Sequence, residues 1–409
     1  MKFREHQLDN GLQIIAECNP DAYSTAVGFF VNTGARDEDA SVAGVSHFLE
    51  HMVFKGSEHR SASDVNRELD ELGSHSNAYT SEEHTVYYAA VLPEYQSPIV
   101  ALLGDMMRPA LREDDFEVEK KVILEEIAKY EDQPPFGAVE KCMALFFRDH
   151  PLGNNILGSE ESVSALTPAQ MRAYFHQRYA PSNITLVATG NVDFDLLVRD
   201  AERQCGSWPA VVSSRHIPPA IGHRGHKVLQ KDRAVQQYVV QLTSGPSSAD
   251  EDRWAGRLMA TILGDDSGSR FFWELIDTGL AEYASLGAFE FQGTGAFITF
   301  LCCAPEEAAE NLQRIHRMQV EMHRQGVTEE ELERAKSKIC AHLVLQYERS
   351  ANRLFSVGNN WLNRRQYRPV REIVDCYQRV TREDIQRVLD KHALTRHATV
   401  AVGPLVELI

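Results

Sequence analysis

The feature that most constrains the possible folds of this sequence is a weak internal duplication. Leu166–Gly190 parallels Val380–Gly403 at an offset of about 214 residues, and each copy has a helix-forming run followed by a strand-like run. A repeat of this length indicates duplicated domains, because solenoid repeats are roughly 20 to 50 residues long. The 409 residues also suit two domains of roughly 200 residues. We therefore expect an α+β protein made of two homologous α/β-sandwich halves, each a mainly antiparallel sheet with helices packed on it.

The boundary between the halves is expected near the middle of the chain. Prolines, glycines and serines with little periodicity fill the segment between Gly206 and Gly225, and this composition is typical of a linker. We expect domains over residues 1–210 and 225–409.

Local patterns predict the elements of the first half. Alternating apolar and polar residues predict strands, and apolar residues spaced three and four apart predict helices. Prolines should divide the long helical stretch from Pro93 to Phe147 into three helices, with breaks at Arg108-Pro109 and at residues 132–135. The expected strands are Leu12–Cys18, Thr25–Thr33, His75–Ser81, His84–Leu92 and Ile184–Thr189, and the other expected helices are Ala43–Phe54, Ala62–Leu72 and Pro168–Arg178.

Charge and cysteine content narrow the classes of function. The formal net charge of −17 opposes phosphate backbones, so we expect no nucleic-acid partner. It would attract basic peptides, although solubility is the simpler explanation. The seven cysteines have no Cys-x-x-Cys spacing, which predicts reduced thiols. With no recognisable signal peptide or membrane-spanning segment, we expect a cytoplasmic protein and no membrane partner.

One helical segment carries a stripe of polar side chains. His47, Glu50 and His51 are spaced i, i+3 and i+4 within an otherwise apolar run from Val45 to Phe54, so they share one face of the helix. Two imidazoles and a carboxylate buried without partners would cost several kcal/mol. Histidines one turn apart suit tetrahedral zinc, and a catalytic zinc site needs a third protein ligand and an open position.

Glu126 is the expected third ligand. It lies in a second predicted helix with apolar residues at positions 116, 122, 123 and 127. Glu119 precedes it by two helical turns and should share its face, where it can orient a ligand or assist proton transfer. The alternative is a solvated or ion-paired stripe, such as His47 with Glu50. We expect the isolated His59, His75 and His84 to be structural.

The motif resembles a known family of peptidases. Residues 44–56 read GVSHFLEHMVFKG, and residues 77–81 (NAYTS) and 85–88 (TVYY) follow. Together they resemble the pitrilysin or insulinase family of metallopeptidases, which includes mitochondrial processing peptidase and carries the inverted His-x-x-Glu-His motif. In that family the last zinc ligand is a glutamate that follows the motif at about the same distance as Glu126 does here. In this sequence 74 residues lie between His51 and Glu126.

The resemblance implies a mechanism and a substrate site. One Zn²⁺ per chain would be bound by His47, His51 and Glu126, with Glu50 as general base and Glu119 beside the metal. The first half would be the active-type peptidase domain. The second would be a degenerate copy, in which Met259, Ile262 and Leu263 stand where the polar stripe was.

Substrate-binding residues follow from the same resemblance. The strand containing Asn77, Ala78 and Tyr79 would pair with an extended peptide, and the second half would contribute Arg270 and Tyr283. A structural ion pair is the alternative for Arg270. The extra residue Glu282 leaves the register of Tyr283 open.

The expected partners are a peptide substrate and a second copy of the chain. Family enzymes enclose a chamber with four such halves, and this chain has two, so we expect a homodimer, with a heterodimer with a related chain as the alternative. The competing class is a non-catalytic assembly subunit, which usually lacks the motif.

Overall fold

The computed structural model describes residues 1–408, which form two compact units. Unit 1 contains Met1–Ala128, Asn154–His216 and Leu345–Arg368, and unit 2 contains Lys129–Gly153, Ile217–Val344 and the chain from Pro369 onward. The chain passes from unit 1 to unit 2 at His216 within the predicted linker, which has no regular structure from residue 209 to 224. Each unit also contains a segment from the other half of the sequence: Leu345–Arg368 lies in unit 1 and Lys129–Gly153 lies in unit 2. The predicted ranges 1–210 and 225–409 assign each of these segments to the other unit.

Unit 1 is built on a six-stranded mixed sheet. Its strand order is β1-β2-β6-β3-β5-β4, in which only β2 and β6 are parallel neighbours. β4 therefore forms one edge of the sheet and has β5 as its neighbour. The strands are β1 (Lys2–Gln7), β2 (Gln13–Cys18), β3 (Thr25–Val31), β4 (His75–Thr80), β5 (Thr85–Val91) and β6 (Ile184–Gly190).

Unit 2 repeats this sheet with one strand fewer. Its order is β7-β11-β8-β10-β9, again with one parallel pair, β7 with β11. The order and directions match β2-β6-β3-β5-β4, so the predicted duplication and α+β class are confirmed. The strands are β7 (Gly225–Gln230), β8 (Gln237–Gly245), β9 (Tyr283–Phe291), β10 (Thr294–Cys303) and β11 (Ala398–Gly403).

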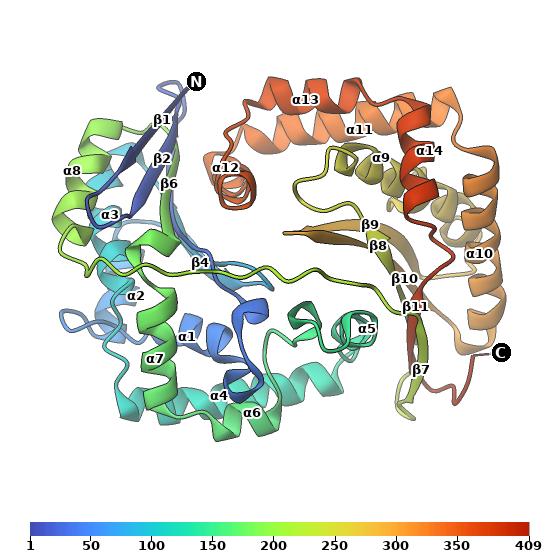
Figure 1. Ribbon diagram of the computed structural model, residues 1–409, viewed down its shortest axis with the longest axis horizontal. Helices are drawn as coiled ribbons and strands as arrows, with labels where there is room; N and C mark the ends of the chain where they lie inside the picture. Colours follow the sequence, from blue (N-terminus) through green and yellow to red (C-terminus); the bar gives the residue numbers. More distant parts are fainter. Residues whose placement is uncertain (409) are drawn as a thin grey trace. The chain divides into compact units, whose positions relative to one another are not determined.

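Helices cover both faces of the unit 1 sheet (Figure 1). One face packs against α1, α3 and α8 in the larger apolar core, which includes Phe29, Phe48 and Leu103. The other face packs against α12, where Leu354 and Val357 contact a smaller core around Phe30. The helices of this unit are α1 (Val45–Val53), α2 (Ala62–Glu71), α3 (Gln96–Met106), α4 (Glu113–Asp132, whose last turn lies in unit 2), α6 (Glu160–Ala165), α7 (Pro168–Arg178), α8 (Phe194–Cys205) and α12 (Ser350–Arg364).

In unit 2 a helix from the first half of the sequence covers one sheet face. α5 packs against β8 and β11 through buried residues such as Cys142 and Phe146. The helices of this unit are α5 (Ala138–Phe147), α9 (Arg253–Gly264), α10 (Ala308–Gln325), α11 (Glu329–Tyr347), α13 (Val370–Gln378) and α14 (Arg382–Lys391). Within residues 1–408, no helix is both long enough and apolar enough to span a bilayer.

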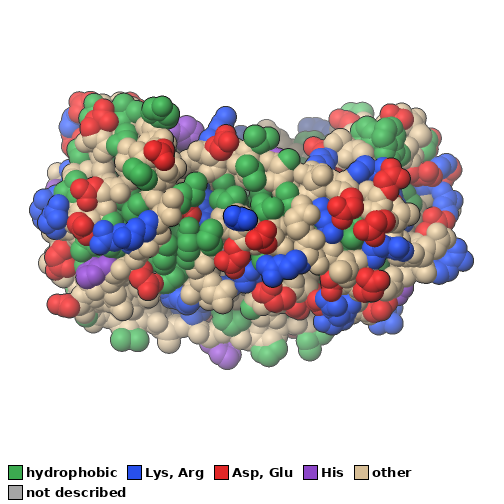
Figure 2. Space-filling view, turned by 90° about the horizontal axis from the view of Figure 1, so that it is seen from above, with side chains coloured by type: hydrophobic (Ala, Val, Ile, Leu, Met, Phe, Trp, Pro, Cys, Tyr) green, Lys and Arg blue, Asp and Glu red, His purple; other side chains and the backbone are tan. Residues whose placement is uncertain are grey.

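Acidic and basic side chains are intermingled on one face of the molecule (Figure 2). On the face shown in Figure 2 they alternate and do not separate into regions of one sign. The net charge of −17 is therefore not gathered into one field on this face. This pattern favours the solubility interpretation of the charge over attraction of basic peptides.

Candidate metal centre

The helix that carries the polar stripe begins at a site where glycine is required. Gly44, the N-cap of α1, has φ 91°, in the region that L side chains rarely adopt. A Cβ there would also lie 2.7 Å from the backbone oxygen of Leu157. The backbone N–H groups of Gly44 and Ser46 both donate to the Glu38 carboxylate, at 2.7 Å each. The buried carboxyl group of Glu38, whose pKa burial raises to about 8, thus accepts two backbone donors at the start of α1 and fixes where this helix begins.

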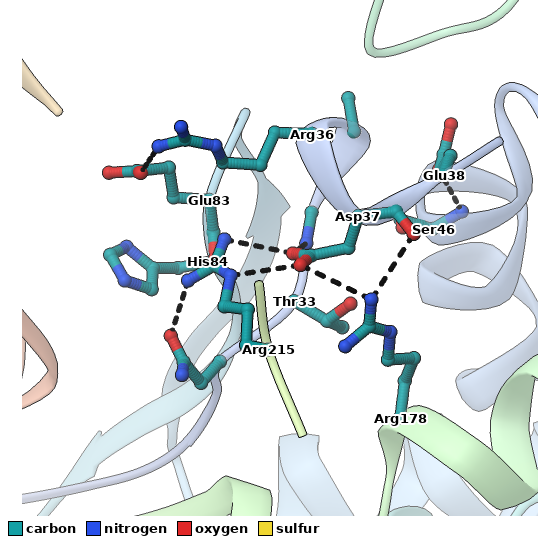
Figure 3. Close-up of polar contacts among 12 residues, drawn as sticks. Thr33, Arg36, Asp37, Glu38, Ser46, Glu83, His84, Arg178 and Arg215 are labelled. Atoms are coloured by element: carbon teal, nitrogen blue, oxygen red, sulfur yellow. Dashed lines mark hydrogen bonds and ion pairs between the residues drawn. The ribbon is translucent and has the colours of Figure 1, made fainter. Parts of the chain in front are cut away.

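A network of charged residues holds the segment that precedes α1 in the sequence (Figure 3). Arg215, from the linker, donates to both oxygens of Asp37 at 2.8 Å each, and Arg178 lies 3.3 Å from the same carboxylate. Both partners of the Arg215 bond are almost fully buried. His84, also buried, lies close to Arg215, and burial and the neighbouring cations lower its pKa to about 3. This outcome agrees with its expected structural role.

Three side-chain atoms from α1 and α4 converge at one point. Nε2 of His47 lies 3.8 Å from Oε2 of Glu126, and Nε2 of His51 lies 3.7 Å from the same oxygen. The three ligand atoms all lie within 4.8 Å of one another. Ligands about 2.1 Å from a tetrahedral zinc ion would be about 3.4 Å apart. The donor set and spacing therefore fit zinc with one open position, and these three residues would hold the ion.

Glu119 fixes the orientation of one of these imidazoles. Nδ1 of His51 lies 2.8 Å from Oε1 of Glu119, and the other oxygen of that carboxylate contacts Lys55. A proton on Nδ1 that is donated to Glu119 leaves the Nε2 lone pair free to face Glu126 and a metal. Burial raises the pKa of Glu119, but the bonds from His51 and Lys55 outweigh it and leave the pKa below its usual value. Glu119 is therefore ionised and acts through His51.

The two histidines differ in their ease of protonation. Burial, reinforced by the nearby His51, lowers the pKa of His47 to about 4, so this imidazole is neutral at neutral pH, as a metal ligand must be. Burial also lowers the pKa of His51, but Glu119, Glu126 and Glu50 outweigh it and raise that pKa above its usual value. A proton would thus compete with the metal mainly at His51.

Glu50 lies outside the ligand triplet but on the same helix face. Its Oε2 accepts a hydrogen bond of 2.7 Å from the Thr80 hydroxyl. Burial raises the pKa of Glu50, and the bond from Thr80 opposes that shift. A raised carboxyl pKa suits a group that takes up a proton near neutral pH. Among the described residues the ion-pair partner of His47 is Glu126 and not Glu50, so the ion-paired alternative for the stripe is not favoured.

The strand predicted to bind substrate is the free edge β4. Ala78 packs toward the larger core, on the face of α1, whereas Tyr79 packs toward α12 and contacts the ring of Phe355 at 5.9 Å. Because side chains alternate along a strand, Asn77 lies on the same face as Tyr79. A peptide beside β4 would pair with its backbone N–H and C=O groups.

Arg270 and Tyr283 both lie in unit 2. The Arg270 guanidinium donates to both oxygens of Glu331, at 2.8 and 3.0 Å. Tyr283 begins the edge strand β9 and is 45% exposed. Arg270 is thus held in an ion pair, and a role for either residue in binding substrate stays a prediction.

Sequence reasoning missed three side chains that support the site. Glu38 and Thr80 are separated by loops from the groups that they contact, so local periodicity does not place them. Lys55 lies one turn beyond His51, and this spacing was the available signal.

The corresponding surface of unit 2 is apolar: Met259, Ile262 and Leu263 are buried in α9.

Two family descriptions match successive parts of the chain. Residues 13–160, which include α1 and α4, match "Insulinase (Peptidase family M16)", and residues 165–339 match "Peptidase M16 inactive domain". An "Uncharacterized zinc protease" of Mycobacterium tuberculosis is 35% identical over 98% of this chain and 93% of its own length. The chain belongs to peptidase family M16. The resemblance to the insulinase family is thereby confirmed, and the second match is to the inactive domain of that family.

Another relative and two solved structures of similar fold have the same extent. A protein of Rickettsia felis, also named an uncharacterized zinc protease, is 30% identical, with 98% of each chain covered. A protease from Helicobacter pylori has the same fold at 21% identity, with a TM-score of 0.92 over 98% of this chain and 99% of its own. A structure from Pseudomonas fluorescens, described as a peptidase M16 inactive domain, has a TM-score of 0.91 at 18% identity and covers 100% of this chain and 99% of its own.

Proposed function

We propose that this M16 protein is a zinc metalloendopeptidase that hydrolyses peptide bonds in peptides or unfolded polypeptide segments. The observation that carries the proposal is the convergence of His47, His51 and Glu126 beside Glu50. The zinc-protease names of its relatives support the choice of metal.

The chain's own residues have distinct roles in the proposed reaction. When bound, zinc would supply Lewis acidity for the scissile carbonyl and lower the pKa of water toward about 7. Glu50, which lies three residues after His47 and next to His51 in the sequence, would take a proton from the attacking water and deliver it to the leaving amine nitrogen. Glu119 would hold His51 in the required tautomer. The edge of β4 would hold an extended peptide by backbone hydrogen bonds.

The Glu50→Gln variant tests the assignment of the base. Glutamine keeps the size of the side chain but cannot accept the proton, so we expect kcat on a quenched peptide to fall by about 10²- to 10⁴-fold. Zinc content, measured by elemental analysis, should stay at one ion per chain. Glu58→Gln, an exposed site, is the matched control and should retain activity. Wild-type kcat in Glu50→Gln would refute the base assignment.

The metal ligands are tested separately. Replacing His47, His51 or Glu126 with alanine leaves two protein ligands, and zinc content should fall well below one per chain. Unchanged zinc would place the metal elsewhere. Loss of zinc together with loss of hydrolysis would support the metallopeptidase proposal and argue against a non-catalytic assembly subunit.

We also propose that the active form is a homodimer. The support is that one chain carries both the His-x-x-Glu-His motif and the candidate residues Arg270 and Tyr283, so a different subunit need not supply either. Light scattering with a parallel activity assay tests this. A monomeric mass with full activity would contradict the dimer, and activity only after addition of a related chain would indicate a heterodimer.

A further inference from the structure

The hydroxyl group of Thr80 is directed at the proposed base. Its Oγ1 lies 2.7 Å from Oε2 of Glu50 and 3.5 Å from Oγ1 of Thr85. The Thr85 hydroxyl proton is already donated to the backbone oxygen of Thr33, at 3.0 Å. Thr85 can therefore act only as an acceptor toward the Thr80 hydroxyl, and its oxygen is farther from Thr80 than the Glu50 oxygen is. The Thr80 hydroxyl consequently donates its proton to the Glu50 carboxyl oxygen.

The bond restricts a side chain that is otherwise free to rotate. A glutamate on a helix has three side-chain torsions, and the last of them is broadly distributed. Anchoring Oε2 at Thr80 fixes that torsion and leaves Oε1 as the oxygen available to a water molecule. Glu50 is partly exposed, so without this bond other orientations toward solvent would be accessible.

The position of Thr80 connects the base to the sheet edge. Thr80 is the last residue of β4 and is the Cα partner of Thr85 on β5. Ala78, two residues earlier, lies on the same face, in contact with the larger core. The donor that orients Glu50 thus belongs to the strand whose free edge would hold the peptide.

We propose that Thr80 is a positioning residue for hydrolysis. It holds the Glu50 carboxylate in the orientation that receives the water proton, and it ties that orientation to the position of strand β4. This inference rests on the proposed function, in which Glu50 is the general base.

The test compares Thr80→Val, which keeps the side-chain shape but loses the hydroxyl, with Thr80→Ser, which keeps the hydroxyl. Residues that orient catalytic groups typically contribute about 10- to 100-fold, so we expect kcat of Thr80→Val on a quenched peptide to fall by about that factor. KM should change by less than about two-fold, because the lost bond acts in the chemical step. Zinc should stay at one per chain, and Thr80→Ser should recover most of kcat.

Thr25→Val is the matched control. The Thr25 hydroxyl donates to the backbone oxygen of Asn191 at 2.6 Å on the buried strand β3 of the same sheet, away from Glu50. This variant should keep wild-type kcat. Equal losses of kcat in both valine variants would overturn the inference, because the loss would then reflect a general effect on the sheet. Wild-type kcat in Thr80→Val would also overturn it.

A crystal structure of zinc-loaded Thr80→Val tests the inference without an activity assay. We expect the Glu50 carboxylate to be displaced or to occupy several conformations. An unchanged Glu50 position would overturn the inference even if the protein hydrolysed no peptide. Activity that survives Glu50→Gln would instead refute the proposed base, so the two failures are distinguishable.

Discussion

Nδ1 of His51 and a carboxylate oxygen of Glu119 are 2.8 Å apart, and the same carboxylate also contacts Lys55. Glu119 precedes Glu126 by two turns of α4, so one helix supplies both a metal ligand and the residue that orients another ligand. The orientation of His51 therefore depends on the side-chain position of Glu119 as well as on α1.

The first prediction concerns Glu119→Gln. A neutral amide keeps the shape but removes the negative charge that stabilises the Nδ1 proton of His51. Zinc affinity and kcat should each fall by about 10- to 100-fold. Competition with a chromogenic chelator measures the affinity. Glu117→Gln, an exposed site on the same helix, should match the wild type, and equal affinity in the two variants would contradict the orienting role.

Local patterns placed most elements correctly, and they predicted that His47, His51 and Glu126 would lie together. The prolines divide residues 93–147 into α3, α4 and α5 as expected, and α7 spans the predicted Pro168–Arg178. The seven-residue spacing of Glu119 and Glu126 fixed their common face because helical geometry is regular. Val122 is an exception: it was expected on the apolar face of α4 but is 47% exposed, because the polar site occupies part of that face.

Long-range packing was not predictable in the same way. α12 has an ordinary amphipathic pattern, and nothing local indicates that Arg353 bonds to Glu17, 336 residues away. The bond from Thr80 to Glu50 likewise depends on how β4 is placed against α1. Periodicity predicts which face of an element is apolar, but not which distant element covers it.

The second prediction concerns the start of α1. Gly44→Ala adds a Cβ at φ 91° and within 2.7 Å of a backbone oxygen. We expect a loss of about 2 to 4 kcal/mol in the free energy of unfolding, measured by urea denaturation, together with weaker zinc binding. Gly73→Ala is the control: its φ is 58° and a Cβ there meets nothing within 4 Å, so it should cost about 1 to 2 kcal/mol, from the backbone conformation alone. Equal losses would show that contact with Leu157 is unimportant.

The third prediction is a pH dependence that arises from His84. Burial, with Arg215 and Arg36 nearby, lowers its pKa to about 3 from an ordinary value of 6.5. The unfolded chain binds a proton below pH 6.5 and the folded chain does not, so stability is retained above pH 6.5 and lost as the pH falls toward 3. The slope approaches about 1.4 kcal/mol per pH unit.

His84→Asn removes this titration. As the pH falls from 6.5 to 5, the free energy of unfolding should decrease less in the variant than in the wild type. The difference between the two decreases should be up to about 2 kcal/mol. Denaturation series at several pH values measure this difference. His59→Asn, at an exposed site, should follow the wild-type curve. A variant curve parallel to the wild type would show that His84 is not the titrating group.

The fourth prediction follows from α12. A fragment of residues 1–216 lacks this helix, which leaves Ile15, Phe30 and Val187 without their apolar cover and Glu17 without Arg353, a bond in which both side chains are 3% exposed. An uncovered apolar sheet face together with an unpaired buried carboxylate should prevent stable folding, since breaking such an ion pair alone costs about 3 to 5 kcal/mol. We expect aggregation on gel filtration and no cooperative unfolding. Co-expression with residues 217–409, which supply α12, should restore soluble material that copurifies as a complex. A monomeric 1–216 fragment that unfolds cooperatively would show that the first sheet is stable without the helix from the second half of the sequence.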